Sequence, residues 1–585
     1  MSRLRSLLAG TDQPANWGIS VLMALAVVGA LLVGRAVGTQ SPTVTVITAI
    51  FVCFAAAIGP LRMALRLVVA LGAAAVGAMA LAHATTGSPW VAAFTMATVA
   101  FVAAIVVAVP VAGPLLGPLG GLIYFIAAAQ HLTSGHTTAR VVESAAAGVV
   151  VAVALAVLLG IRDPRKGSRE AVAEAWLPET SFSDQGRAAP VLGLDGRPKV
   201  LTALLRGASL ATLGAATARR MAPGDPRLGP PLKAAEEQRR AIATALKPRG
   251  RLVPRSLPSW GDAVQVAADD PGLGGPTRLG LRNVDLAIGR STGILTGEES
   301  APESSRFGFG LTVEVLRAVL HPDAALFRYG VQRAIALGTA MYALQVTHGG
   351  ENAYWIILSL WTALQPRARA TIVKAVQRSA GTLVGAGLAI VVSLVLPDAI
   401  LYPAVAGVIL LVGLAFMQRN YVVTAAAMGA FIALEKGVPS HNVLGWAGLR
   451  VLDTAIGCVL AILVTYLILP ARPRQEYRLR RAREALDAAV DCLLAASAAG
   501  RFDAAAARKV YARVLSCLTD LENERDLVPA AGLAAYDAQV AALTQAHDDL
   551  RMLALLVVHD PASEIIPVTL ETIRQEYAAT AAAPA

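Results

Sequence analysis

The chain contains two blocks of roughly six apolar stretches each, at residues 17–161 and 330–470, separated by a long polar segment. Stretches such as Gly18–Gly34, Trp90–Val109 and Val451–Leu469 each offer about 17–20 mostly uncharged residues, enough to cross about 30 Å of hydrocarbon. Hydrophobic residues make up 55% of the chain and charged residues only 16%, whereas a soluble chain carries about 25% charge. The bilayer is therefore the expected solvent for half of this chain.

The two blocks share one internal order: an apolar span, a proline, a basic turn and a span rich in small residues. Further on, Arg140 and Glu143 open the last span of the first block, and Arg450 and Asp453 open the last span of the second. The other corresponding positions are Pro60 and Pro366, Gly72 and Gly381, Gly77 and Gly385, and Gly148 and Gly457. This order predicts an all-α polytopic membrane protein with two parallel six-helix transmembrane repeats, each followed by a cytoplasmic helical domain.

The expected domains are a first transmembrane block (1–162), a cytoplasmic helical domain (163–326), a second transmembrane block (327–470) and a C-terminal cytoplasmic helical bundle (471–585). Helical periodicity supports both cytoplasmic domains, near Val200–Ala218 and Leu279–Ile294 and in the tail. The apolar stripes of the tail are Leu479, Leu486, Val490 and Leu493, then Val510, Val514, Cys517, Leu518 and Leu521, then Leu543, Leu550, Leu553 and Leu556.

Basic residues gather on one side of the predicted spans, as the positive-inside rule requires of the cytoplasmic side. These residues are Arg62, Arg66, Arg162, Arg165, Lys166, Arg328, Arg333, Arg367, Arg369, Lys374, Arg378, Arg419, Arg472 and Arg474. The first span is interpreted as uncleaved, with both termini in the cytoplasm. Topology thus explains the net charge of +11, and nucleic-acid binding is not expected.

Three motifs stand in the second block: YW-x9-QP at Tyr354–Pro366, R-x2-GT-x2-G at Arg378–Gly385 and R-x2-DT-x2-G at Arg450–Gly457. At these residues the chain resembles the fusaric acid resistance protein-like family, also called the aromatic acid exporter or integral membrane bound transporter family. The resemblance implies a transporter of the bacterial inner membrane, and some members of the family export aromatic carboxylic acids. The first block lacks the Tyr-Trp pair and the Gly-Thr step. The plant malate-channel family is similar in architecture, and this chain would be a fused version of its dimer.

Ionisable residues inside or beside spans are expensive and need a partner or a water-filled cavity. The i,i+3 spacing of Arg140 with Glu143, and of Arg450 with Asp453, puts both charges on one helix face where they can pair. Two interpretations stay open. The pairs either stabilise the helix ends, or they line a pathway in which the carboxylate takes a proton and the arginine attracts an anion.

The basic turn of the second block is the expected entrance for an anion from the cytoplasm, with Lys374 and Arg378 closest to the span. Tyr354 and Trp355 are expected to anchor this span at the membrane interface. Trp361 lies deeper in the span and is a candidate for stacking on an aromatic substrate. Gly381, Gly385 and Gly457 are expected to serve helix packing. The expected substrate pathway consists of Arg140, Glu143, Trp361, Lys374, Arg378, Arg450 and Asp453.

The segment Val111–Phe125 carries Pro114 and Pro118 among four glycines. Broken helices in transporters often border the binding cavity, because irregular backbone is tolerated only where protein or water satisfies it. We therefore expect this segment beside the pathway.

Three functions compete: a proton-coupled exporter of small organic, aromatic carboxylate anions, a passive anion channel, and a membrane component of envelope-precursor export or assembly. The chain lacks a Gly-Lys dipeptide, which excludes a Walker-type P-loop, and it has no paired-cysteine metal spacing. No enzyme activity, metal or cofactor is expected. The expected partners are the small organic anion and the lipid bilayer, while a periplasmic adaptor protein and a homo-oligomer stay open.

Overall fold

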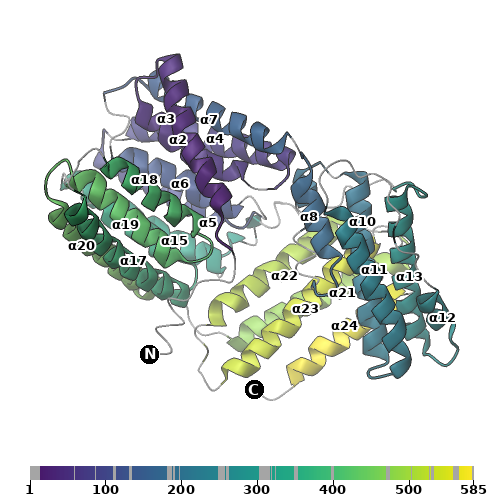
Figure 1. The fold of residues 1–585 in the computed structure, drawn as a ribbon. Coiled ribbons are helices and arrows are strands. Elements are labelled where there is room, and N and C mark those ends of the chain that lie inside the picture. Colours follow the sequence, from purple (N-terminus) through teal and green to yellow (C-terminus); the bar gives the residue numbers. More distant parts are fainter. Residues whose placement is uncertain are drawn as a thin grey trace. The chain divides into compact units, whose positions relative to one another are not determined.

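The structure, a computed structural model, describes residues 14–582 with short gaps. The gaps are 58, 86, 110–112, 131–134, 162, 181–187, 189–190, 197, 248–256, 258–261, 302–315, 318, 323, 348–353, 397–400, 470–474, 502, 526–527, 529–531 and 558–564. The described residues form helices joined by turns, with no strand among them (Figure 1). Arg162, Arg472 and Arg474, which entered the topology prediction, lie outside the described residues.

The chain divides into two compact units, and each is described by itself. Unit 1 combines the two apolar blocks, and unit 2 combines the two segments predicted to be cytoplasmic domains. Unit 1 consists of Met1–Ala57, Leu67–Leu158 and Leu320–Arg472, and unit 2 of Ile58–Arg66, Leu159–Val319 and Pro473–Ala585. The divisions between the units fall after Leu158, Val319 and Arg472, and the short turn Ile58–Arg66 joins unit 2. The membrane and cytoplasmic locations of the expected domains stay a prediction.

Each apolar block contains six helices among its described residues. The first block has α2 (Trp17–Val37), α3 (Pro42–Ala56), α4 (Leu61–Thr85), α5 (Pro89–Val106), α6 (Gly113–Ala129) and α7 (Thr138–Gly160). The second block has α15 (Ala325–Val346), α16 (Tyr354–Ala363), α17 (Ala368–Val395), α18 (Tyr402–Ala415), α19 (Tyr421–Gly437) and α20 (Val443–Leu467). The proline-rich segment forms α6, which runs through Pro118 as one helix.

Seven described helices are long and apolar enough to cross a membrane. Six of them belong to the blocks, namely α2, α4, α5, α7, α17 and α20, and the seventh is α10 (Lys199–Met221) of unit 2. The other helices of the blocks are shorter or more polar, and α16 has 10 residues, or about 15 Å of helix. The all-helical membrane architecture is confirmed, while two parallel repeats of six spans each stay a prediction.

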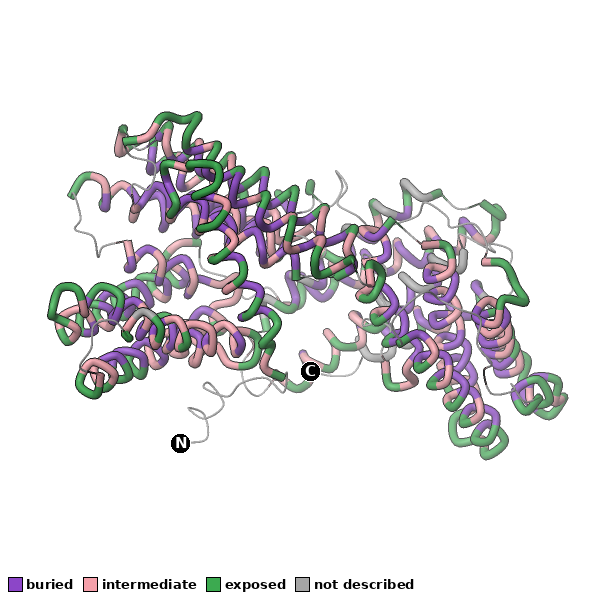
Figure 2. The backbone as a smooth tube through the Cα atoms, turned by 45° about the horizontal axis from the view of Figure 1, so that its top comes forward, coloured by how far each residue is buried: buried purple, intermediate pink, exposed green. Residues whose placement is uncertain are grey.

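The buried faces of α17 and α20 in unit 1 consist mainly of small and polar residues, and their outer faces are apolar, the arrangement expected in lipid. In α20 the buried face is Ala447, Arg450, Asp453, Thr454, Gly457, Cys458, Ala461 and Thr465. Its large exposed side chains are Leu444, Leu449, Leu452, Ile456, Val459, Leu460, Leu463, Tyr466 and Leu467. Figure 2 shows how exposed positions alternate with buried ones along the helices. This pattern delivers the charges of α20 to the interior of the bundle.

Unit 2 has a helical core in each of its two parts. Its helices are α8 (Lys166–Ala175), α10, the 3-10 turn η1 (Pro226–Leu228), α11 (Gly229–Leu246), α12 (Ala263–Asp269), α13 (Gly275–Thr296), α21 (Gln475–Ala498), α22 (Ala504–Glu524), α23 (Leu533–Val557) and α24 (Ile565–Ala582). The predicted helices near 200–218 and 279–294 are confirmed as α10 and α13. The apolar stripes of the tail form one buried cluster against which Val510 packs, apart from Leu556, whose side chain lies outside the described residues. The apolar residues of α10 pack within unit 2, where Gly214 of α10 lies against Gly280 of α13.

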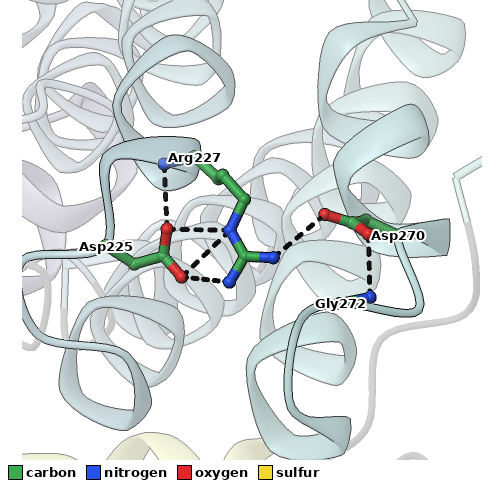
Figure 3. A network of polar contacts seen from close by, with 4 residues as sticks. All are labelled: Asp225, Arg227, Asp270 and Gly272. Carbon is green, nitrogen blue, oxygen red and sulfur yellow. Dashed lines mark hydrogen bonds and ion pairs between the residues drawn. The ribbon is translucent and has the colours of Figure 1, made fainter.

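A polar clasp joins two turns of unit 2 (Figure 3). Asp225 accepts hydrogen bonds from the backbone N–H and the Nε of Arg227, each 3.0 Å long. The other side of the same guanidinium reaches Asp270 at 3.5 Å, and Asp270 accepts the N–H of Gly272 at 2.8 Å. The hydrogen bonds from Arg227 hold the pKa of Asp225 below its usual range. The charged side chains of this clasp thus bind one another.

Glycines lie where the helices of unit 1 approach most closely. A Cβ at Gly385 of α17 would collide with the carbonyl oxygen of Ala426 in α19, and one at Gly381 would meet the carbonyl of Val422 at 2.6 Å. Gly457 of α20 packs in the same way on Ile356 and Ser359 of α16. In the first block Gly148 of α7 packs on Thr45 and Thr48 of α3. The last helix of each block thus meets the second helix of that block through the glycines that the sequence comparison paired.

We predict that Gly385→Ala destabilises the protein, because the added methyl group has no space against the backbone of α19. Overpacking of this kind costs about 1–3 kcal/mol. Gly387→Ala is the matched control on the same helix, since a Cβ there meets nothing within 4 Å. Thermal unfolding of the detergent-solubilised variants measures the difference, and equal midpoints for the two variants would contradict the packing shown here.

Candidate functional site

The short helix α16 provides the wall of the candidate site. Its C-terminal end is satisfied locally, since the hydroxyl of Tyr329 donates to the carbonyl of Leu364 at 3.1 Å and Thr371 Oγ1 accepts the N–H of Gln365 at 3.0 Å. These bonds allow α16 to end inside the bundle. Trp355 and Ser359 lie one turn apart on α16, and both are buried. Each of them contacts an arginine from another helix.

Arg450 of α20 stacks on Trp355. Its guanidinium carbon lies 3.8 Å from the centroid of the indole ring, within the range of a cation–π contact. The Arg450 side chain is buried, with the residue only 3% exposed. Its Nε and Nη1 atoms have no hydrogen-bond partner. An arginine with free donors on a buried helix face is equipped to bind an anion.

Arg378 of α17 contacts the same face of α16 at Ser359, one turn after Trp355. Its Nε donates to Ser359 Oγ at 3.2 Å, and its Nη1 donates to the hydroxyl of Tyr421 at 3.0 Å. Lys374 precedes Arg378 by one turn, and its Nζ lies 3.5 Å from the centroid of the Tyr421 ring. Arg378 is also within electrostatic range of Arg450. Lys374, Arg378 and Arg450 are called the cationic cluster below.

Tyr421 is positioned by the start of α19. The side chain of Asn420 caps this helix by accepting the N–H of Val422 at 2.9 Å, so that Tyr421 occupies the first turn. The N-terminus of a helix carries a partial positive charge. It therefore adds to the positive potential of the cationic cluster and does not neutralise it.

Asp453 lies three residues after Arg450 on the buried face of α20 and is 6% exposed. Its Oδ2 has no hydrogen-bond partner, and no ion pair within 4.0 Å joins it to Arg450 among the described contacts. The two side chains thus share a helix face, as their spacing predicts, without closing a salt bridge. Arg450 keeps free donors and Asp453 keeps a free acceptor.

The corresponding pair in the first block, Arg140 and Glu143, lies in a different environment. Arg140 and Glu143 are both exposed, and Arg140 donates to Gln40. The structure does not bring them to the cationic cluster. By the glycine contacts, Thr48 of α3 corresponds to Ser359, and Val44 stands where the second block has Trp355. The first block therefore lacks the aromatic ring on which Arg450 stacks.

Trp361 lies on the other side of α16, under a different arginine. The guanidinium carbon of Arg333 is 4.0 Å from the centroid of the Trp361 ring and 5.4 Å from that of Tyr329. The positive-inside reading placed Arg333 before the first span of this block, but it lies within α15 and is buried. The prediction for Arg333 was wrong because a single arginine near a helix start has the same pattern whether it faces water or the bundle.

Sequence reasoning missed several residues of the site. Trp355 was interpreted as an anchor at the membrane interface, and Ser359 and Tyr421 were not recognised as site residues. The i,i+4 spacing of Trp355 and Ser359 is the available signal, because it puts both on one helix face. Of the basic turn, Lys374 and Arg378 join the cluster, whereas Arg367 precedes α17 as its cap and Arg369 is exposed.

Unit 2 offers a weaker candidate, a cavity of about 320 Å³ beside the clasp, lined by Arg219, Asp225, Lys233 and Glu236 among others. Arg219 pairs with Glu236, and Asp225 pairs with Arg227. Since these charges neutralise one another, the cationic cluster is the better site. The described residues contain no group of His, Cys, Asp and Glu suited to a metal ion.

Comparison with known proteins gives a family match in the second block. No curated protein and no solved structure matches the chain. A family model described as fusaric acid resistance protein-like matches residues 335–464, the range that contains the cationic cluster, Trp355, Asp453 and the three sequence motifs. Together with the apolar helices, this match identifies the chain as a multi-pass membrane protein of transporter type that carries a fusaric acid resistance protein-like domain at residues 335–464.

Proposed function

We propose that this protein exports small organic anions across the bacterial cytoplasmic membrane, with both termini in the cytoplasm. The observation that carries the proposal is Arg450, a buried guanidinium with two free donor atoms. A charge buried in a membrane bundle without a partner is costly, and such residues mark ion and substrate pathways. The family match at residues 335–464 supports the same conclusion.

The balance of charge favours an anion. The cationic cluster brings three positive charges together, and Asp453 is the acidic residue that shares its helix face. A carboxylate is the ligand that the free Arg450 donors suit best, because guanidinium binds it through paired N–H groups. The rings of Trp355 and Tyr421 face the cations of the cluster. Hence the proposed substrates are aromatic carboxylates, whose rings pack on these side chains while the carboxylate meets the arginines.

Asp453 is the proposed proton carrier. Its buried carboxylate has a free oxygen and lies beside the arginine that binds the substrate. A carboxylate that takes up a proton as the anion leaves Arg450 would couple export to the proton gradient, whereas a passive channel would need the arginines alone. The role of Asp453 therefore separates an exporter from a channel.

We predict that Arg378→Gln and Arg450→Gln each slow the efflux of radiolabelled benzoate from proteoliposomes by about tenfold or more, the worth of one charge-assisted hydrogen bond. Arg140→Gln is the comparison variant, since Arg140 is exposed and outside the cluster, and it should transport at the wild-type rate. Unchanged efflux in both cluster variants, with wild-type expression, would count against the proposed site. A loss in Arg140→Gln alone would move the pathway to the first block.

We predict that Asp453→Asn abolishes the acceleration of benzoate efflux by a pH gradient but retains benzoate exchange in the absence of a gradient. The amide keeps the shape of the side chain and cannot carry a proton. Glu143→Gln is the matched control, because Glu143 holds the corresponding position in the first block and is exposed. Persistent gradient dependence in Asp453→Asn would exclude this residue as the proton carrier and favour the channel.

A further inference from the structure

Arg333 is a second buried arginine that the proposed site does not use. It is 2% exposed, and its Nε has no hydrogen-bond partner. Among the described residues no carboxylate lies within ion-pair distance of it. Its guanidinium lies against the rings of Trp361 and Tyr329 and shares a hydrogen bond with the Tyr329 side chain. Cation–π contacts offset only part of the cost of burying a charge. An anion is the partner that this position lacks.

The position of Arg333 sets it apart from the cationic cluster. It contacts α16 at Trp361, which lies about 200° around the helix from Ser359 at 100° per residue. The two arginine sites thus lie on opposite faces of α16. Arg450 and Trp355 belong to one face, and Arg333 and Trp361 belong to the other.

Arg333 also lies at the contact between the two blocks of unit 1. Its helix α15 packs on α5 of the first block, where Gly330 meets Phe101 and Gly338 meets Ala97. Trp361 completes this contact on the side of α6. A Cβ at Gly121 would lie 2.5 Å from Cη2 of the indole ring, so the ring occupies the notch that this glycine leaves. Trp361 is therefore held between Gly121 of one block and Arg333 of the other.

We propose that Arg333 is a second binding station for the carboxylate group of an organic anion, and that the Trp361 ring covers this station when it is empty. The inference rests on the proposed function and extends it to a pathway with two stations, one on each face of α16. At the second station the carboxylate binds the guanidinium of Arg333, and the Trp361 ring moves aside. The glycine notch in α6 fixes the covered position of the ring.

Tryptophan fluorescence tests the second station directly, with 4-bromobenzoate as the probe, because its bromine quenches an indole that it touches. If 4-bromobenzoate binds at Arg333, the wild type is quenched more than Trp361→Phe. If 4-bromobenzoate binds at Arg450, the wild type is quenched more than Trp355→Phe. We expect both differences when the rest of the chain is unchanged. Arg333→Gln should lose the Trp361 difference and keep the Trp355 difference, and Arg333→Lys should retain part of the former.

The outcomes separate this inference from the proposed function. A Trp355 difference without a Trp361 difference overturns the second station and leaves the first intact. The absence of both differences overturns the two together for carboxylates. A Trp361 difference that survives Arg333→Gln, in a variant that elutes and melts as the wild type does, also contradicts the role of Arg333.

A matched pair of glycine variants tests the cover. Gly121→Ala should displace the Trp361 ring from its covered position, because the added methyl group fills the notch that the ring occupies. The Trp361 quenching difference should therefore appear at a 4-bromobenzoate concentration about tenfold lower than in the wild type. Gly120→Ala should leave this concentration unchanged, because its Cβ would lie at an ordinary 3.8 Å from Ala74. Equal concentrations in the two variants would contradict the covering role of Trp361.

Discussion

The stacking of Arg450 on Trp355 is the contact on which the rest of the site depends. A guanidinium in the interior of an apolar bundle must be stabilised, and an indole ring does this without neutralising the charge or occupying its donors. A carboxylate in the same place would close a salt bridge and leave nothing for a ligand. The structure places Asp453 on the same helix face but unpaired, so Arg450 is stabilised and yet open to an anion.

The second block can hold such a contact because α17 and α20 bury mainly small and polar residues and expose apolar ones. The buried face of α20 combines glycine, alanine and threonine with its two charged residues. Small residues bring the helices close together, as Gly457 does with α16 and Gly385 with α19. Because the helices lie close together, Arg378 of α17 and Arg450 of α20 both reach α16, where they contact Ser359 and Trp355. The glycine contacts and the arginine contacts are thus parts of one packing arrangement.

The sequence was sufficient to predict the helical membrane architecture and the region of the site, because apolar length and the motifs of the second block are visible in one dimension. It was not sufficient to predict which face of each helix turns inward, since these helices are apolar on almost every side. For this reason the matching Arg-x-x-acid pairs of the two blocks looked equivalent, although Arg140 is exposed and Arg450 is buried. For the same reason Arg333 resembled a flanking charge, and Trp355 resembled an interface anchor.

The central claim is that the buried arginines of the second block bind an organic anion. Locating the iodine of bound 4-iodobenzoate by anomalous scattering in a crystal of the full chain tests it most directly. The account predicts an iodine site against Trp355 or Tyr421, with the carboxylate within hydrogen-bond reach of Arg450 and Arg378. An iodine site beside Arg140 and Glu143, or an unoccupied cationic cluster at saturating ligand, would contradict it.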